Sequence, residues 1–382
     1  MEQNLIALTD PDISTLELDA VANVLKSSRL SSGRLAERFE DAFAESLGRR
    51  YGISVASGTI ALMVSLRALG IGPGDEVIAS AYSWHQIANA ITLVGATPVF
   101  ADIDYWSGTL AVDKAEAKVT PATRAIVAGN TNGHPAAWEP FRALALACGI
   151  KLIEDSTEAI GSRYQGQLVG TFGDLAIFDF SQPSALVCGE GAMIVTDDPD
   201  LASELFYHRS RSLDERFSVS ISSRVPLQAP ISNMAAALGL AQLDRLDEIL
   251  ARRKRTESYY SDYIQSFEGI KPPYIAPEVN EVHWMVYVIH LGTRFTRSAR
   301  NQIVDDLATA EIEVAAYCNP LHLQYFYGTL GYKKGNLFVT EKVADRSLAL
   351  PFHAHLDKDT IQFIVTTAKD SSINVGAGAA IY

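Results

Sequence analysis

Short apolar runs alternate with amphipathic segments through the first half of the 382-residue chain. The runs are rich in Val and Ile and are bounded by Gly and Asp turns, which is typical of buried strands in a mostly parallel sheet. Strands are expected at 77–81, 97–101, 125–128, 151–153, 176–180 and 193–196. Helices are expected at 16–27, 35–47, 59–69, 86–94, 113–118 and 140–148. The pattern therefore predicts an α/β fold.

The second half of the chain predicts a smaller α/β domain. One long helix is expected at 232–255, with a basic run at 252–255 that we interpret as solvated surface. A turn-rich link at 269–273 precedes an expected strand at 284–291 and expected helices at 297–310 and 358–368. We predict a large domain over residues 1–250 and a small domain over 251–382.

Composition and charge narrow the function classes. The net charge is −13 and no dense basic run occurs apart from 252–255, which argues against nucleic acid or an anionic membrane as a partner. The three cysteines, Cys148, Cys188 and Cys318, are too far apart for a disulfide framework or a metal site. No signal peptide or membrane-spanning run is evident. We expect a cytoplasmic protein that acts on a small molecule.

Several segments occur in a specific order along nearly the whole chain, at 31–33, 56–62, 70–78, 95–104, 153–156, 173–191, 235–243 and 320–324. Together they resemble the DegT/DnrJ/EryC1/StrS sugar aminotransferases. The resemblance implies fold type I of the transferases that use pyridoxal phosphate (PLP), with a mostly parallel seven-stranded sheet in the large domain and a smaller C-terminal α/β domain. It also implies a homodimer with sites at the subunit interface.

Four residues retain the family's cofactor contacts. The resemblance implies that Gly58 and Thr59 offer helix N-terminal amides to a cofactor phosphate. It implies that Asp155 pairs with the pyridine nitrogen and that Trp84 stacks on the ring.

Other positions depart from the family pattern. Ser184 stands where the resemblance places the Schiff-base lysine, and a hydroxyl cannot form a Schiff base. Asp179 replaces a phosphate-binding serine, so a carboxylate would repel the phosphate by on the order of several kcal/mol. The residues at 228–230, Gln-Ala-Pro, stand where the family has Asn-Tyr-Arg. These changes predict that no cofactor binds. The family resemblance alone implies PLP or pyridoxamine phosphate (PMP).

A vacated pocket would be acidic. Glu158 stands where the family often has glutamine, and with Asp155, Asp179 and Glu190 it could supply acid and base groups. The alternative is that some of these carboxylates point elsewhere or bind backbone amides.

Four further side chains are candidates for chemistry. His85 could carry protons or be a structural polar residue, and His322 lies in a segment that approaches the substrate in the family. Cys188 could be a nucleophile or a small buried residue. Ser184 could be a nucleophile, although no motif supplies its base.

These expectations favour a PLP-independent enzyme that uses acid/base or group-transfer chemistry on a polar specialised metabolite, such as a sugar, a cyclitol or an amino-acid derivative. Natural product biosynthesis is the pathway class that the resemblance implies. The alternatives are a PMP-dependent deoxysugar dehydratase and a noncatalytic subunit, and a conventional aminotransferase is disfavoured.

Overall fold

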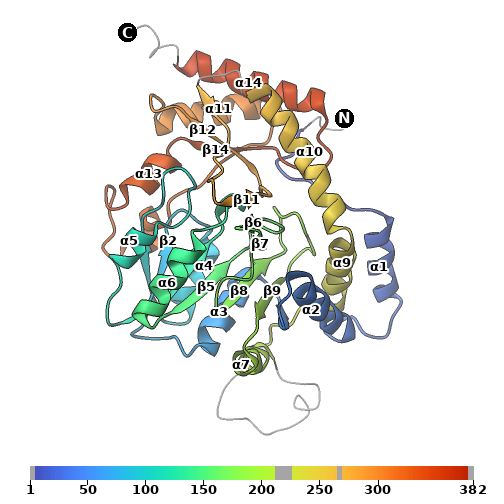
Figure 1. The fold of residues 1–382 in the computed structure, drawn as a ribbon. Coiled ribbons are helices and arrows are strands. Elements are labelled where there is room, and N and C mark those ends of the chain that lie inside the picture. The colour runs from blue at the N-terminus through green and yellow to red at the C-terminus, as the bar shows by residue number, and fades with distance from the viewer. Residues whose placement is uncertain (1–4, 211–225, 265–268, 377–382) are drawn as a thin grey trace.

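A seven-stranded sheet forms the centre of the computed structural model, which describes residues 5–210, 226–264 and 269–376 (Figure 1). In spatial order its strands are β1 (Tyr51–Val55), β9 (Ala192–Thr196), β8 (Leu175–Asp179), β5 (Lys151–Asp155), β4 (Thr123–Gly129), β2 (Glu76–Ser80) and β3 (Thr97–Ala101). From β8 to β3 all neighbouring pairs are parallel, whereas β9 is antiparallel to β1 and β8. The predicted mostly parallel seven-stranded sheet is confirmed.

Helices cover both faces of this sheet because successive strand residues point to opposite sides. Val77 and Val127 pack in a cluster with α3 (Gly58–Ala68), α4 (His85–Leu93) and α7 (Pro199–Arg209). Ile78 and Ile126 pack on the other face, where α6 (Trp138–Cys148) lies. The remaining helices of this half are α1 (Thr15–Leu25), α2 (Arg34–Leu47), α5 (Val112–Glu116) and α9 (Asn233–Asp244).

A second, antiparallel sheet lies beside the first in the C-terminal part of the chain. Its order is β10 (Ile270–Lys271), β12 (Tyr287–Leu291), β14 (Ser347–Leu350) and β13 (Ala315–Ala316). A three-stranded ribbon of β11 (Val279–Glu281), β6 (Arg163–Tyr164) and β7 (Gln167–Leu168) lies between the two sheets (Figure 1). The helices of this part are α10 (Leu246–Ile264), α11 (Arg297–Thr309), α12 (Tyr325–Gly328), α13 (Phe338–Ala344) and α14 (Lys358–Gly376).

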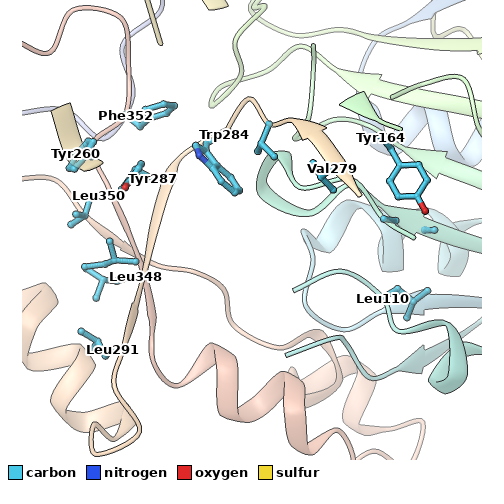
Figure 2. Close-up of a cluster of buried hydrophobic side chains, with 14 of the residues drawn as sticks. Leu110, Tyr164, Tyr260, Val279, Trp284, Tyr287, Leu291, Leu348, Leu350 and Phe352 are labelled. Carbon is cyan, nitrogen blue, oxygen red and sulfur yellow. The ribbon is translucent and has the colours of Figure 1, made fainter. Parts of the chain in front are cut away.

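One buried cluster joins the two sheets. Figure 2 shows it running from Leu348 and Leu350 of the small sheet through Trp284 to Tyr164 and Leu110. Because the cluster is continuous, the two halves of the molecule pack around one common core. The division into domains at residue 250 stays a prediction, and that residue lies within α10.

The predicted single helix at 232–255 is wrong. Helix α9 ends at Asp244 and α10 begins at Leu246, with Arg245 between them at φ −105° and ψ 5°. The buried Arg245 guanidinium donates to Asp12 Oδ1 at 2.8 Å and to Glu17 Oε1 at 2.6 Å. Apolar spacing could not predict the break, because both acidic partners lie more than two hundred residues earlier.

The N-terminal strap, residues 6–17, contacts both halves of the molecule. Ile6 forms a parallel bridge with Ile312, and the Leu8 amide donates to Glu313 Oε2 at 2.8 Å. Farther along the strap, Asp12 and Glu17 bind Arg245, as described above. The strap therefore links the small-sheet region to the α9–α10 junction.

No helix among the described residues combines the length and apolar character needed to cross a membrane.

Candidate functional site

The candidate site forms where the large sheet presents the carboxyl ends of its parallel strands, the edge at which ligands bind in open α/β sheets. Asp155 ends β5 and Asp179 ends β8, and these two strands are direct neighbours. A small pocket here is lined by Asp155, Asp179, Gly58 and Trp84, together with Leu62, Gln86, Ile87, Thr157 and Ile177. The structure thus brings together four of the residues singled out in the sequence.

Asp155 is one of the two carboxylates that line this pocket. Its Oδ1 accepts a hydrogen bond from the Thr157 amide at 3.1 Å. Burial, together with the nearby carboxylates of Asp179 and Glu154, raises the pKa of Asp155 to about 6. No cation among the described residues pairs with it through a salt bridge. The geometry leaves Asp155 able to pair with a cationic or protonated ligand atom.

Gln86 adds an unsatisfied hydrogen-bond acceptor to the pocket. Its Oε1 is buried and has no hydrogen-bond partner among the described residues. A buried acceptor without a partner costs about 1–3 kcal/mol. A ligand that carries a hydrogen-bond donor would remove this cost.

Glu158 lies next to the pocket in a polar network. Tyr317 donates its hydroxyl to Glu158 Oε2 at 2.5 Å, the Asn132 amide donates to the same oxygen, and Trp84 also hydrogen-bonds the carboxyl group. Burial, together with the charge of Asp155, raises the pKa of Glu158 to about 7. Glu158 can therefore hold or release a proton near neutral pH.

Asp179 binds the N-terminus of α3. Its Oδ2 accepts from the Gly58 amide at 2.9 Å and its Oδ1 accepts from the Ser181 amide at 2.8 Å. Asp179 is 4% exposed. The helix amide that the family resemblance assigns to a phosphate is thus bonded to a carboxylate of the same chain.

The other predicted residues lie outside this cluster. Thr59 follows Gly58 on the first turn of α3, and His85 is exposed at the first position of α4. Ser184 is half-buried and its Oγ accepts from the Leu186 amide at 3.3 Å. Cys188 is buried, which raises the pKa of its thiol to about 12, and Glu190 is exposed. None of these five lines the pocket around Asp155.

His322 is fully buried away from that pocket. Its Nε2 lies 3.0 Å from Glu341 Oε1, and its ring contacts Tyr332. The roles predicted for this histidine and for the other site residues stay predictions.

Sequence reasoning missed Tyr317 and Asn132, which bind Glu158 together with Trp84. Asn132 has φ 50° and is followed by Gly133 at φ 100°, and an Asn-Gly pair is a recognisable signal for a turn of this kind. Tyr317 comes five residues before His322. No local signal identifies it, because its partner is 159 residues away.

Comparison with known proteins gives a consistent match along the chain. The model of the DegT/DnrJ/EryC1/StrS aminotransferase family matches residues 11–369. The chain is 34% identical over 364 residues to a GDP-perosamine synthase from Caulobacter vibrioides, covering 94% of this chain and 96% of that protein. The aminotransferase TlmJ from Streptoalloteichus hindustanus superimposes with a TM-score of 0.89 at 28% identity, covering 97% of this chain and 100% of TlmJ.

A further solved relative is known with vitamin B6 cofactors. Spr1654 from Streptococcus pneumoniae is known in a PMP form, with a TM-score of 0.91 at 25% identity over 98% of this chain and 100% of that chain. Its PLP form gives a TM-score of 0.90 at 26% identity over 97% of this chain and 99% of that chain.

These findings contradict the expected PLP-independent function, the expected absence of a cofactor and the disfavoured status of an aminotransferase. Taken alone, the changes at 179, 184 and 228–230 predict the loss of B6 chemistry. That inference is wrong because a few altered contacts do not outweigh a match over nearly the whole chain to aminotransferases with PLP and PMP forms.

Proposed function

Because this chain belongs to the DegT/DnrJ/EryC1/StrS aminotransferase family, we propose that it is a vitamin B6-dependent enzyme that transfers an amino group to a keto sugar linked to a nucleotide. The name of the Caulobacter relative, GDP-perosamine synthase, supports the sugar class. When bound, the cofactor would carry the amino group and withdraw electrons from the reacting carbon.

The environment of Asp155 is the main support for this proposal. Asp155 is a carboxylate with a raised pKa, without a salt-bridge partner in the described chain, in a pocket that Trp84 also lines. A protonated ring nitrogen is the partner that such a carboxylate lacks, and an indole is a suitable face for a planar ring. The residues therefore fit the ring end of the cofactor.

The phosphate end fits less well. Asp179 Oδ2 already accepts from the Gly58 amide, so a phosphate at this amide must displace the carboxylate. No lysine is among the described residues that line the pocket, and Ser184 offers a hydroxyl instead of an amine. We therefore propose that the cofactor is held by noncovalent contacts to Asp155, Trp84 and the first turn of α3.

Glu158 and Tyr317 would manage the proton beside the ring. With a pKa of about 7, the Glu158 carboxyl group is part protonated at neutral pH, and the Tyr317 hydroxyl orients it through the 2.5 Å hydrogen bond. Such a group can hold a proton at one oxygen or give it up without a large free-energy change. Its place next to Trp84 sets it at the edge of the pocket.

We also propose that the active form is a homodimer with its sites at the subunit interface. Trp84, which lines the pocket, is 37% exposed and the next residue, His85, is also exposed, so this side of the site is open for a partner chain to cover. Light scattering on the purified protein should give about twice the 41.5 kDa chain mass, and a monomer would refute this part of the proposal.

PMP binding tests the core of the proposal. Calorimetric titration should show saturable binding of PMP to the wild type, and Asp155→Ala should weaken it at least tenfold because the ring nitrogen loses its partner. Asp113→Ala, at an exposed position of α5, serves as the matched control. Failure of PMP and PLP to bind, or equal affinity in Asp155→Ala, would contradict the proposal.

Removing the competing carboxylate gives a second test. Asp179→Ser should raise the affinity for PMP about tenfold or more, because the Gly58 amide becomes free and a negative charge is removed. The same variant should leave the affinity for pyridoxamine without phosphate nearly unchanged. If both ligands respond equally, Asp179 does not occupy the phosphate position.

Amino transfer is then measured directly. Mass spectrometry of nucleotide-linked keto sugars incubated with glutamate and PMP should show an amino sugar, and Glu158→Gln should slow its formation. Ser184→Lys should add an absorbance band on PLP addition if position 184 is where the family's lysine acts. PMP binding without any amino product would retain the site but reject amino transfer.

A further inference from the structure

A second cavity lies apart from Asp155, between the small sheet and the loop that follows β3. Its volume is about 790 Å³, within the range of small-molecule sites. Its lining includes Trp106, Lys271, Tyr274, His290, Lys342 and Arg346. The wall therefore combines segments from β10, β12 and α13 with that loop.

Aromatic rings dominate one side of the cavity. The centroids of the Trp106 and Tyr274 rings are 5.9 Å apart at 45°, and the Tyr105 ring meets Trp106 edge-on at 5.2 Å. Trp106 is 55% exposed, although it is the largest side chain of the wall. An exposed indole beside other rings is a ready surface for a planar ligand.

The charged groups of the cavity all have the same sign. Lys271, Lys342 and Arg346 line it, and no Asp or Glu is among the described lining residues. This excess is notable in a chain with a net charge of −13. Like charges around one cavity favour an anion that neutralises them.

Arg346 is incompletely satisfied in this wall. Its Nε donates to the Phe295 carbonyl at 3.1 Å, but its buried Nη1 has no hydrogen-bond partner among the described residues. A buried guanidinium donor without an acceptor is unfavourable, and an anionic oxygen is its preferred partner. Lys342 Nζ lies 5.4 Å from the centre of the Tyr105 ring, so cationic and aromatic groups are adjacent.

From these observations we propose that the cavity binds a small ligand with a planar ring and an anionic group, such as a nucleoside monophosphate or an aromatic carboxylate. The ring lies against Trp106 and Tyr274, and the anion binds Arg346 and Lys342. This proposal does not rest on amino transfer, since none of these residues lines the pocket around Asp155.

A smaller pocket connects this cavity with the Glu158 network. It shares Trp106, Tyr274 and His290 with the cavity, and it also reaches Asn132 and Tyr317, which bind Glu158. A ligand in the cavity therefore lies next to the groups that hold the Glu158 proton.

Ligand titration tests the proposal on the full-length protein. The probes are the four common nucleoside monophosphates, 4-hydroxybenzoate and inorganic phosphate. Calorimetry and tryptophan fluorescence measure the binding of each. At least one ring-bearing anion should bind tenfold or more tightly than inorganic phosphate. The tighter of the two ring classes identifies the source of the ligand, and a failure of all the ring-bearing anions to bind overturns the proposal.

Variants then locate the binding site. Trp106→Ala and Lys342→Gln should each weaken binding at least fivefold, while Lys118→Gln, an exposed lysine on the segment after α5, should not change it. Asp155→Asn should also leave the affinity unchanged. Binding that survives both cavity substitutions, or that is lost with Asp155→Asn, would refute the assignment to this cavity. Circular dichroism establishes that each variant is folded.

Discussion

Substitution of Glu158 by glutamine should remove a pH dependence from the stability of the protein. Glu158 is 8% exposed and its pKa is raised from 4.5 to about 7, mainly by burial. A carboxyl group with a raised pKa binds more protons in the folded state, so its contribution to stability is largest at low pH and is lost as the pH rises toward 7. The glutamine amide keeps an acceptor for Tyr317 but has no charge to bury.

The magnitude follows from the two pKa values. Between pH 5.5 and pH 8 the folded wild type must release a proton that the unfolded chain has already lost. With pKa values of 4.5 and about 7, this costs about 2 kcal/mol of unfolding free energy over that range. When the pH is raised from 5.5 to 8, the free energy of unfolding of Glu158→Gln should therefore rise by about 2 kcal/mol relative to that of the wild type.

Urea unfolding at the two pH values, followed by tryptophan fluorescence and circular dichroism, measures the difference. Glu116→Gln, an exposed position on α5, should follow the wild type at both pH values. The burial argument fails if Glu158→Gln and the wild type lose the same stability between pH 5.5 and 8, because Glu158 would then titrate as an ordinary surface carboxyl group.

Two further substitutions test the fold. Arg245→Met should destabilise the protein by about 3–5 kcal/mol, because Glu17 stays buried without a cation and Asp12 keeps only its ion pair with Arg252; urea unfolding measures the loss, and less than about 1 kcal/mol would show that these acids are solvated. Gly133→Ala should lower the melting temperature, since Gly133 has φ 100° and an added Cβ would lie 2.4 Å from the His283 carbonyl oxygen. Calorimetry that shows no change would refute the close contact.

The sequence predicts the large sheet well because the strands carry their own signal. The expected strand at 97–101 is β3, and the expected strand at 176–180 is displaced from β8 by one residue. No prediction covers β1 (Tyr51–Val55), whose apolar run is interrupted by Gly52 and the polar Ser54. That serine is buried because its hydroxyl donates to Glu40, a contact that hydrophobic spacing does not encode.

The sequence predicts the site residues that lie at strand ends but not those that reach the site from distant segments. Asp155 and Asp179 follow apolar runs, and the carboxyl ends of parallel strands meet at one edge. Tyr317 and Asn132 reach Glu158 from distant segments, and His322 lies with Glu341 instead of joining the pocket. Side-chain contacts between distant segments decide these cases, so residue type and spacing alone could not.

The N-terminal strap has a consequence for the order in which the molecule is assembled during synthesis. Leu8 donates to a carboxylate 305 residues later, and the Phe352 amide donates back to the Leu8 carbonyl. At about 5–20 residues per second, the ribosome needs on the order of 15–60 s to make that distance of chain. The strap therefore leaves the ribosome long before the residues that hold it, and is among the last segments to reach its native position.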